Sequence, residues 1–211
     1  FLPITLAIYF AVPLRWRNLA LLLASLVFYG WGEPVYILIM FLSIAIDYTH
    51  GMLVERCKAR GNDRGARWAV ASSVFFNLAL LGFFKYWDFL AASFQAVGLN
   101  FMPVLNVHLP IGISFYTFQS MGYVMDVYRE IVEPEKNFLK VALFVSFFPQ
   151  IIQGPIAIYD KLAGQLYEGH SLRLENLQKG ALLVLWGVMK KLVIADRAVN
   201  IINFVMDKPM D

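Results

Sequence analysis

Residues 109–129 read LPIGISFYTFQSMGYVMDVYR, and the fold prediction depends on the polar residues of this stretch. Helical spacing places four side chains on one face of a helix, namely Phe115, Gln119, Gly122 and Asp126. A charged Asp126 at membrane depth needs a partner, such as Arg129 one turn on or a lysine from another helix. This face predicts either helix–helix packing through hydrogen bonds and small residues, or the lining of a polar cavity.

The composition around this stretch is typical of a membrane protein. Of 211 residues, 59% are hydrophobic and 16% are charged, and the mean hydropathy is +0.60. A soluble domain is usually about 45–50% apolar and about 25% charged. The values exclude a disordered chain, and the one cysteine excludes a disulfide framework and a cysteine-rich metal site, so no metal site is predicted. A net charge of +3 gives no argument for nucleic-acid binding.

Runs free of charged residues divide the chain into about six to eight membrane elements. Residues 68–84 and 141–159 are each long enough to span a bilayer, and 89–125 is long enough for two elements. Basic residues in short loops predict which side of the membrane each loop faces. The loops predicted inside are 15–17, 55–67 and 129–140. The 30–34 loop is predicted outside, and the 98–110 connection is predicted either to face outside or to dip partly into the bilayer. We therefore predict an all-α polytopic membrane protein, with residues 1–211 as a single transmembrane region.

Residues 147–156 read FFPQIIQGPI and cannot form an unbroken helix. Pro149 and Pro155 lack the backbone donor that a helix interior uses. Non-helical backbone at membrane depth persists only where protein or a water-filled cavity surrounds it. Gln150 and Gln153 lie where freed carbonyls need donors. The stretch predicts either a kink satisfied by those amides or a re-entrant segment that borders a substrate path.

A later apolar helix carries two adjacent lysines, Lys190 and Lys191. They are interpreted either as interfacial anchors or as groups that attract an anionic donor at the cytoplasmic face. The histidines are isolated, and His50, which follows Asp47, fits an interfacial polar residue better than a catalytic base. The sequence lacks a serine nucleophile elbow, a dinucleotide-binding loop and a Walker loop.

The run 109–129 resembles the hallmark segment of the membrane-bound O-acyltransferase family, in its bacterial alginate O-acetyltransferase-like branch. Residues 82–87, 147–156 and 190–196 are similar to the same branch and follow in the expected order. The resemblance covers nearly the whole chain. It implies the N-terminal portion of a longer domain truncated at both ends, and the chain opens at Phe1 inside an apolar run.

The resemblance implies a multi-pass enzyme of the inner membrane, built as a helical funnel with broken or re-entrant segments. Such an enzyme moves an acetyl group from a cytosolic thioester, such as acetyl-coenzyme A, towards an extracytoplasmic polysaccharide. A separate acetyl-transferring protein, the polysaccharide acceptor and membrane lipid are the implied partners. Neither a bound cofactor nor nucleic acid is expected. The family's signature histidine is expected after Asp211, so no catalytic residue is predicted within this chain.

The resemblance carries over scaffold or substrate-path positions rather than catalytic ones. They are Gln119, Asp126, Tyr128, Arg129, Pro149, Gln150, Gly154 and Pro155, with Lys190 and Lys191 as a possible basic pair on the donor side. Two alternatives stay open. One is D-alanyl transfer to teichoic acid within the same family, and the other is a non-catalytic membrane transporter or anchor.

Overall fold

A computed structural model describes residues 1–99, 101–152 and 155–206, and within these ranges the chain is helical with no strand. The elements are α1 (Leu2–Ala11), α2 (Leu14–Gly32), α3 (Ile37–Ala59), α4 (Asp63–Ala96), α5 (Ile113–Tyr128), α6 (Phe138–Ser146), α7 (Tyr159–Tyr167), α8 (Leu174–Met189), the π-helix η1 (Lys190–Ala195) and α9 (Asp196–Met206). The chain divides into two compact units, Phe1–Gly169 and His170–Asp211, and each is described by itself.

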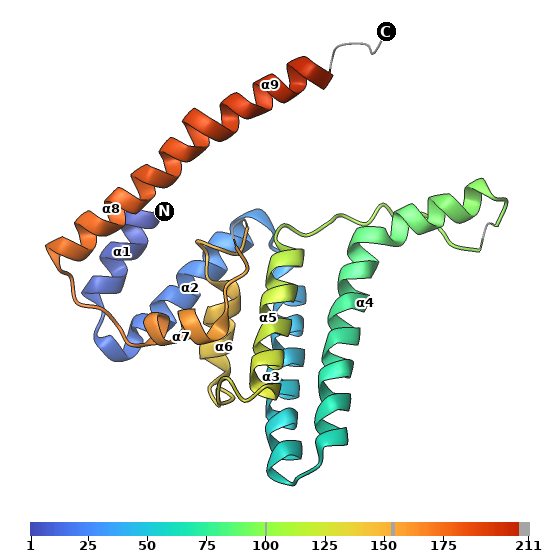
Figure 1. The fold of residues 1–211 in the computed structure, drawn as a ribbon, viewed down its shortest axis with the longest axis horizontal. Helices are drawn as coiled ribbons and strands as arrows, with labels where there is room; N and C mark the ends of the chain where they lie inside the picture. Colours follow the sequence, from blue (N-terminus) through green and yellow to red (C-terminus); the bar gives the residue numbers. More distant parts are fainter. Residues whose placement is uncertain (100, 153–154, 207–211) are drawn as a thin grey trace. The chain divides into compact units, whose positions relative to one another are not determined.

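Three long helices of the first unit, α3, α4 and α5, pack side by side, with α4 antiparallel to the other two (Figure 1). The turn into α4 is set by Asn62, whose side chain accepts a hydrogen bond from the backbone of Gly65 at 2.9 Å. At the same end of the bundle, Lys58 of α3 and Glu130, which follows α5, form an ion pair at 2.6 Å. The bundle therefore places the 55–67 and 129–140 loops at one end, as the charge pattern predicts.

Two helices, α3 and α4, are long and apolar enough to cross a membrane. Only 33% of the most apolar window of α3 and 22% of that of α4 are buried inside the protein. A core helix of a soluble protein would bury most of such a window, so the exposed apolar surface indicates a membrane protein. The prediction of six to eight membrane elements is not confirmed by these two helices.

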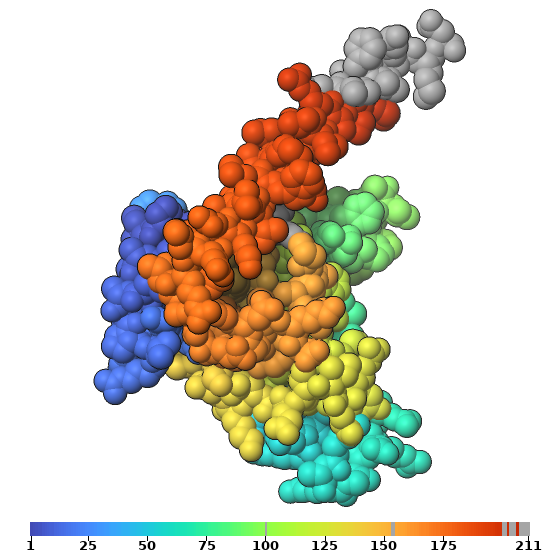
Figure 2. Space-filling model, turned by 60° about the vertical axis from the view of Figure 1, so that its left-hand side comes forward, coloured from blue at the N-terminus to red at the C-terminus, as the bar shows by residue number. Residues whose placement is uncertain are grey.

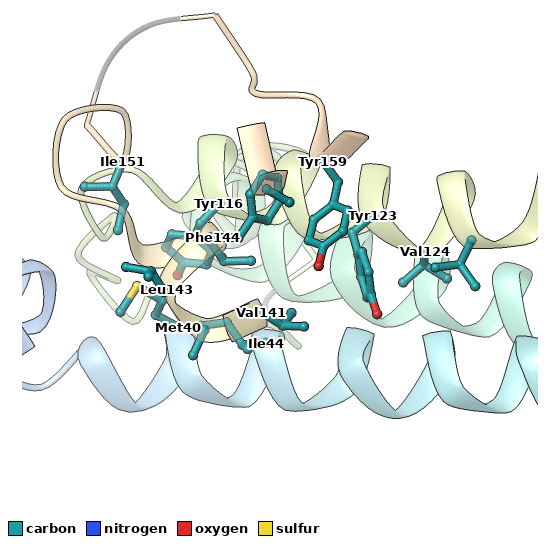
Figure 3. Close-up of a cluster of buried hydrophobic side chains, with 14 of the residues drawn as sticks. Met40, Ile44, Tyr116, Tyr123, Val124, Val141, Leu143, Phe144, Ile151 and Tyr159 are labelled. Atoms are coloured by element: carbon teal, nitrogen blue, oxygen red, sulfur yellow. The ribbon is translucent and has the colours of Figure 1, made fainter. Parts of the chain in front are cut away.

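The core of the first unit lies where α3, α5, α6 and α7 meet (Figure 3). The last six residues of the short helix α6, 141–146, are all buried. Its Phe144 packs edge-on against Tyr159 of α7, with ring centroids 4.8 Å apart. Burying a side chain of this size contributes about 1.5–3 kcal/mol. A nine-residue helix is marginal alone, so packing rather than length holds α6 in place.

The charge-free stretch 141–159 does not form a single helix, in agreement with the break predicted at residues 147–156. Helix α6 ends at Ser146 and α7 begins only at Tyr159. Pro149 has no N–H to continue the helical hydrogen bonds, and the backbone N–H of Phe148 instead donates to the Ser25 hydroxyl at 3.2 Å. The described residues between the two helices form turns and irregular backbone, as the proline spacing predicts.

The connection from α4 to α5 folds back along the C-terminal turns of α4 (Figure 1). The Asp88 carboxylate accepts hydrogen bonds from the backbone N–H groups of Leu105, Asn106 and Val107, at 2.6 to 3.2 Å. The Trp87 indole donates to the Pro103 carbonyl at 3.1 Å. These bonds give an exposed loop a defined path, because its backbone donors find partners on the preceding helix.

The second unit forms one continuous rod of α8, η1 and α9, whose visible side chains are drawn in orange and red in Figure 2. The π-helix in its middle contains Lys190 and Lys191. Helix α8 and η1 have no buried side chain.

Candidate functional site

Two glutamines from the predicted set meet at one carbonyl group. The side-chain amide of Gln119 on α5 donates to the Phe144 carbonyl at 2.8 Å, and that of Gln150 donates to the same oxygen at 3.2 Å. This carbonyl belongs to the last turn of α6, where helix termination leaves carbonyl groups without backbone donors. The amide of Gln150 therefore satisfies a freed carbonyl, and Gln119 adds a second donor from another helix.

The start of the hallmark helix touches the broken segment directly. Gly112 caps α5 in the left-handed conformation at φ +77°, and a side chain there would collide with the backbone carbonyl of Ile151. Glycine fits because it adopts this conformation without steric cost and leaves room for the second backbone. Ile151 is fully buried and points into the core (Figure 3). Two of the segments that carry the family resemblance, 109–129 and 147–156, thus pack directly against each other.

The two predicted prolines of the broken segment lie at the surface of the protein. Pro149 and Pro155 are exposed, and Gly154 lies outside the described residues, as does Gln153. Pro149 follows the end of α6 by three residues and prevents the helix from continuing, because it lacks a backbone N–H.

Asp126, Tyr128 and Arg129 lie at the opposite end of α5 from Gly112. Asp126 is half-buried, and its carboxylate interacts electrostatically with Arg129, which has the opposite charge, and with Asp160 of α7, which has the same charge. The Lys58 ammonium group sits over the Tyr128 ring at 4.8 Å, a cation–π contact. The predicted residues of the hallmark stretch therefore fall into two separate places rather than one site.

A buried polar network between α3, α4 and α5 was not predicted. Asp47 is fully buried, and its carboxylate accepts hydrogen bonds from Ser73 at 2.5 Å, from Asn77 at 2.7 and 2.9 Å, and from Ser120. Ser43 extends the network by donating to the Asn77 side-chain oxygen at 2.9 Å. Four hydrogen bonds, donated by side chains of α4 and α5, satisfy a carboxyl group on α3 that burial would otherwise destabilise.

The sequence signal for this network is the pairing of polar residues one helical turn apart inside apolar runs. Ser43 precedes Asp47 by four residues, and Ser73 precedes Asn77 by four. His50 does not belong to the network, because its Nδ1 lies 2.6 Å from the Ile46 carbonyl of its own helix. Asp47 thus holds helices together and does not orient His50 as a base.

A second polar cluster lies near the N-terminal end of α5. Glu33 is buried at the end of α2, and its carboxylate lies 3.4 Å from Nε2 of the exposed His108. The His108 ring stacks on the Tyr36 ring, with centroids 5.8 Å apart.

Four hydroxyl oxygens are buried without a hydrogen-bond partner among the described residues, those of Tyr29, Tyr116, Thr117 and Ser146. Of these, the Tyr29 and Tyr116 rings pack edge-on at 6.4 Å, and their hydroxyls do not meet hydrogen-bond geometry.

Three tyrosine hydroxyls fix the loop that joins α5 to α6 and the helix after it. The Tyr48 hydroxyl donates to the Lys136 carbonyl at 2.7 Å, and the Tyr167 hydroxyl donates to the Lys140 carbonyl at 2.7 Å. The Tyr123 hydroxyl accepts from the backbone N–H of Glu135 at 3.0 Å. Burial raises the pKa of Tyr167 above its usual range, so this phenol stays a neutral donor at physiological pH.

Lys190 and Lys191 lie in the π-helix, a local form that often occurs at functional sites. The Lys190 ammonium group sits over the Trp186 ring at 5.4 Å, and both lysines are exposed. Their role as a donor-side pair stays a prediction. Among the described residues, no group of three or more histidine, cysteine, aspartate or glutamate side chains could hold a metal ion.

The chain is similar over most of its length to curated bacterial O-acetylases. It is 37% identical to the "Probable alginate O-acetylase AlgI" of Pseudomonas syringae pv. tomato, over 93% of this chain and 38% of that protein. It is 34% identical to the protein of the same name from Pseudomonas aeruginosa, over 93% of this chain and 38% of the relative. The chain is a homologue of the alginate O-acetylases. The predicted resemblance to bacterial alginate O-acetylases is confirmed.

This O-acetylase homologue is also 31% identical to the "Peptidoglycan O-acetyltransferase" of Helicobacter pylori, over 99% of this chain and 45% of that protein. The chain thus spans about two fifths of the length of the curated relatives it matches. No family model matches the chain. No solved structure matches it either. The roles predicted for Gln119, Asp126 and the other scaffold positions of this O-acetylase homologue stay predictions.

Proposed function

We propose that the protein to which this chain belongs is an inner-membrane, multi-pass O-acyltransferase. It takes acetyl groups from a cytosolic thioester, such as acetyl-coenzyme A, and delivers them for O-acetylation of an extracytoplasmic polysaccharide. The observation that carries the proposal is the similarity of 93% of the chain to alginate O-acetylases. The apolar exposed surfaces of α3 and α4 support a place in the membrane.

Acyl transfer to a hydroxyl needs a base that takes the hydroxyl proton and donors that stabilise the oxyanion. In this proposal the histidine that acts as the base lies outside residues 1–211. The described residues supply the frame. The Asp47 network joins α3, α4 and α5, and the Phe144 carbonyl joins α5 to the broken segment. The frame positions a substrate path and a separate acetyl-transferring partner protein completes delivery.

The direct test is the chemical identity of the ester on surface polysaccharide. Cells that lack the gene are complemented with the full-length protein, and esters are released by mild alkali and analysed by mass spectrometry. We expect acetate to return with the gene. Release of D-alanine instead would favour teichoic acid modification, and no ester difference would favour a transporter or anchor. A requirement for a small acidic carrier protein, rather than acetyl-coenzyme A, would also point to D-alanyl transfer.

Asp126 tests whether the hallmark helix serves this reaction. We expect Asp126→Ala to lower acetylation about tenfold or more at equal protein level, because the residue carries a half-buried charge on α5, a helix of the frame that positions the proposed substrate path. Membrane protein level is measured by immunoblot in the same cells. Unchanged level together with unchanged acetylation contradicts a role for this residue.

A further inference from the structure

The first turns of α4 present a basic and aromatic face that the packing of the bundle does not use. An open hollow of about 370 Å³ is lined by Arg64, Arg67, Trp68 and Ala71. These positions share one side of the helix, and the opposite side, with Ala66, Ala69 and Ser73, is buried against the bundle. Trp68 is 75% exposed, which is unusual for a side chain whose burial is strongly favoured.

The two arginines have no hydrogen bond or ion pair in the part of the chain that the structure describes. They lie three residues apart on a helix, so both guanidinium groups reach the same hollow. Guanidinium groups in this arrangement match the oxygens of a phosphate group.

Further along α4 the same face becomes apolar. Beyond Ala71 it continues with Phe75, which is 67% exposed, and Leu78, which is 46% exposed. From its start, the face therefore passes from cationic to amphipathic aromatic to apolar within about four turns of helix. This order matches the layers of a bilayer leaflet, in which phosphate is outermost, tryptophan lies at the interface, and hydrocarbon lies below.

We propose that this face, formed by Arg64, Arg67, Trp68, Ala71 and Phe75, binds the headgroup of an anionic phospholipid. Arg64 and Arg67 hold the phosphate, Trp68 covers the glycerol region, and Phe75 contacts the acyl chains. The 55–67 loop is predicted to face the cytoplasm, where the leaflet is rich in anionic lipid. A soluble phosphate compound would leave the aromatic and apolar part of the face unused.

The test uses the full-length protein in phosphatidylcholine vesicles that contain a brominated lipid, with bromine near the glycerol end of the acyl chains. Bromine quenches the fluorescence of a tryptophan in contact with that lipid, and the part lost in Trp68→Phe is the Trp68 signal. We expect brominated phosphatidylglycerol to quench this signal at a lower mole fraction than brominated phosphatidylcholine. Arg64→Gln and Arg67→Gln should each reduce this preference about tenfold or more, because each removes a hydrogen bond between a guanidinium group and the lipid phosphate.

Arg60→Gln is the matched control, because Arg60 is exposed in the turn just before α4 and its loss changes the net charge equally. This variant should change the preference less than about twofold. The proposal is overturned if the two brominated lipids quench equally, if Arg60→Gln acts like Arg64→Gln, or if neither lipid quenches Trp68, since another protein surface then covers it. Loss of the preference in excess inorganic phosphate, but not in chloride of equal ionic strength, would assign the arginines to free phosphate and also overturn it. None of these outcomes depends on acetyl transfer.

Discussion

At the scale of single residues, the buried carboxylate of Asp47 is held by several hydrogen bonds. It has no exposed surface, and its carboxylate meets donors from two neighbouring helices. A buried acceptor of this kind stabilises the bundle only while its donors are present, because an unpaired polar group in a low-dielectric interior is costly. The network therefore makes helix association depend on a few hydroxyl and amide groups.

Two adjacent serines on α4 provide a test of this network, because Ser73 donates to Asp47 and Ser72 does not. We expect Ser73→Ala to lower the free energy of unfolding by about 1–3 kcal/mol, because Asp47 loses a buried donor. Ser72→Ala should change it by less than about 0.5 kcal/mol, since the Ser72 hydroxyl bonds only to the Ala69 carbonyl of its own helix. Thermal unfolding in detergent micelles measures both, and equal effects would contradict the importance of the network.

The shared carbonyl of Phe144 predicts coupling between Gln119 and Gln150. Either Gln119→Ala or Gln150→Ala leaves one amide donor on this oxygen, whereas the double variant leaves none. We expect the double variant to lose more stability than the sum of the single variants, by about 0.5–3 kcal/mol. A double-mutant cycle in unfolding free energy measures the term, and strict additivity would show that the two amides act separately.

At the scale of elements, the contact between α5 and the broken segment depends on the lack of a side chain at Gly112. We expect Gly112→Ala to destabilise the first unit by about 1–3 kcal/mol or more. Alanine is strained in the left-handed conformation of this position, and its side-chain carbon would collide with the Ile151 carbonyl. Limited proteolysis of the 147–156 segment should speed up as it detaches from α5.

Gly122 on the same helix provides the control. A side-chain carbon at this position would find open space, and the backbone there has an ordinary helical conformation. Gly122→Ala should therefore leave stability unchanged or raise it by up to about 1 kcal/mol, since alanine favours helix more than glycine. A loss as large as that of Gly112→Ala would mean that the effect comes from the helix rather than from the contact with Ile151.

Much of the element pattern could be predicted from the sequence. The prolines at 149 and 155 predict a broken backbone, and the structure shows α6 ending at Ser146. The length of the apolar run at 141–159 does not by itself show where the helix ends, because apolar surface carries no signal of where helical hydrogen bonds stop; the prolines carry that signal. The Asp47 network escaped prediction for another reason. Asp47, Ser73 and Ser120 are far apart in the sequence, and only helix packing brings them together.

At the scale of the whole molecule, the direction of α3, α4 and α5 makes the predicted orientation testable. Residue 60, between α3 and α4, and residue 104, in the connection before α5, lie at opposite ends of α4. We expect a membrane-impermeant maleimide to label Val104→Cys in intact spheroplasts and Arg60→Cys only after permeabilisation. Both variants are made in a full-length protein whose native cysteines, including Cys57, are replaced by serine. Labelling of both sites without permeabilisation would contradict the orientation.

The carbonyl that receives two amides also offers a spectroscopic handle. Each hydrogen bond draws electron density from the C=O bond and lowers its stretching frequency, and a carbonyl oxygen has two lone pairs to share. The stretching frequency of the Phe144 carbonyl therefore reports whether Gln119 of α5 and Gln150 of the broken segment are both hydrogen-bonded to it. An isotope-edited infrared band at this position should shift to higher wavenumber whenever either glutamine moves away.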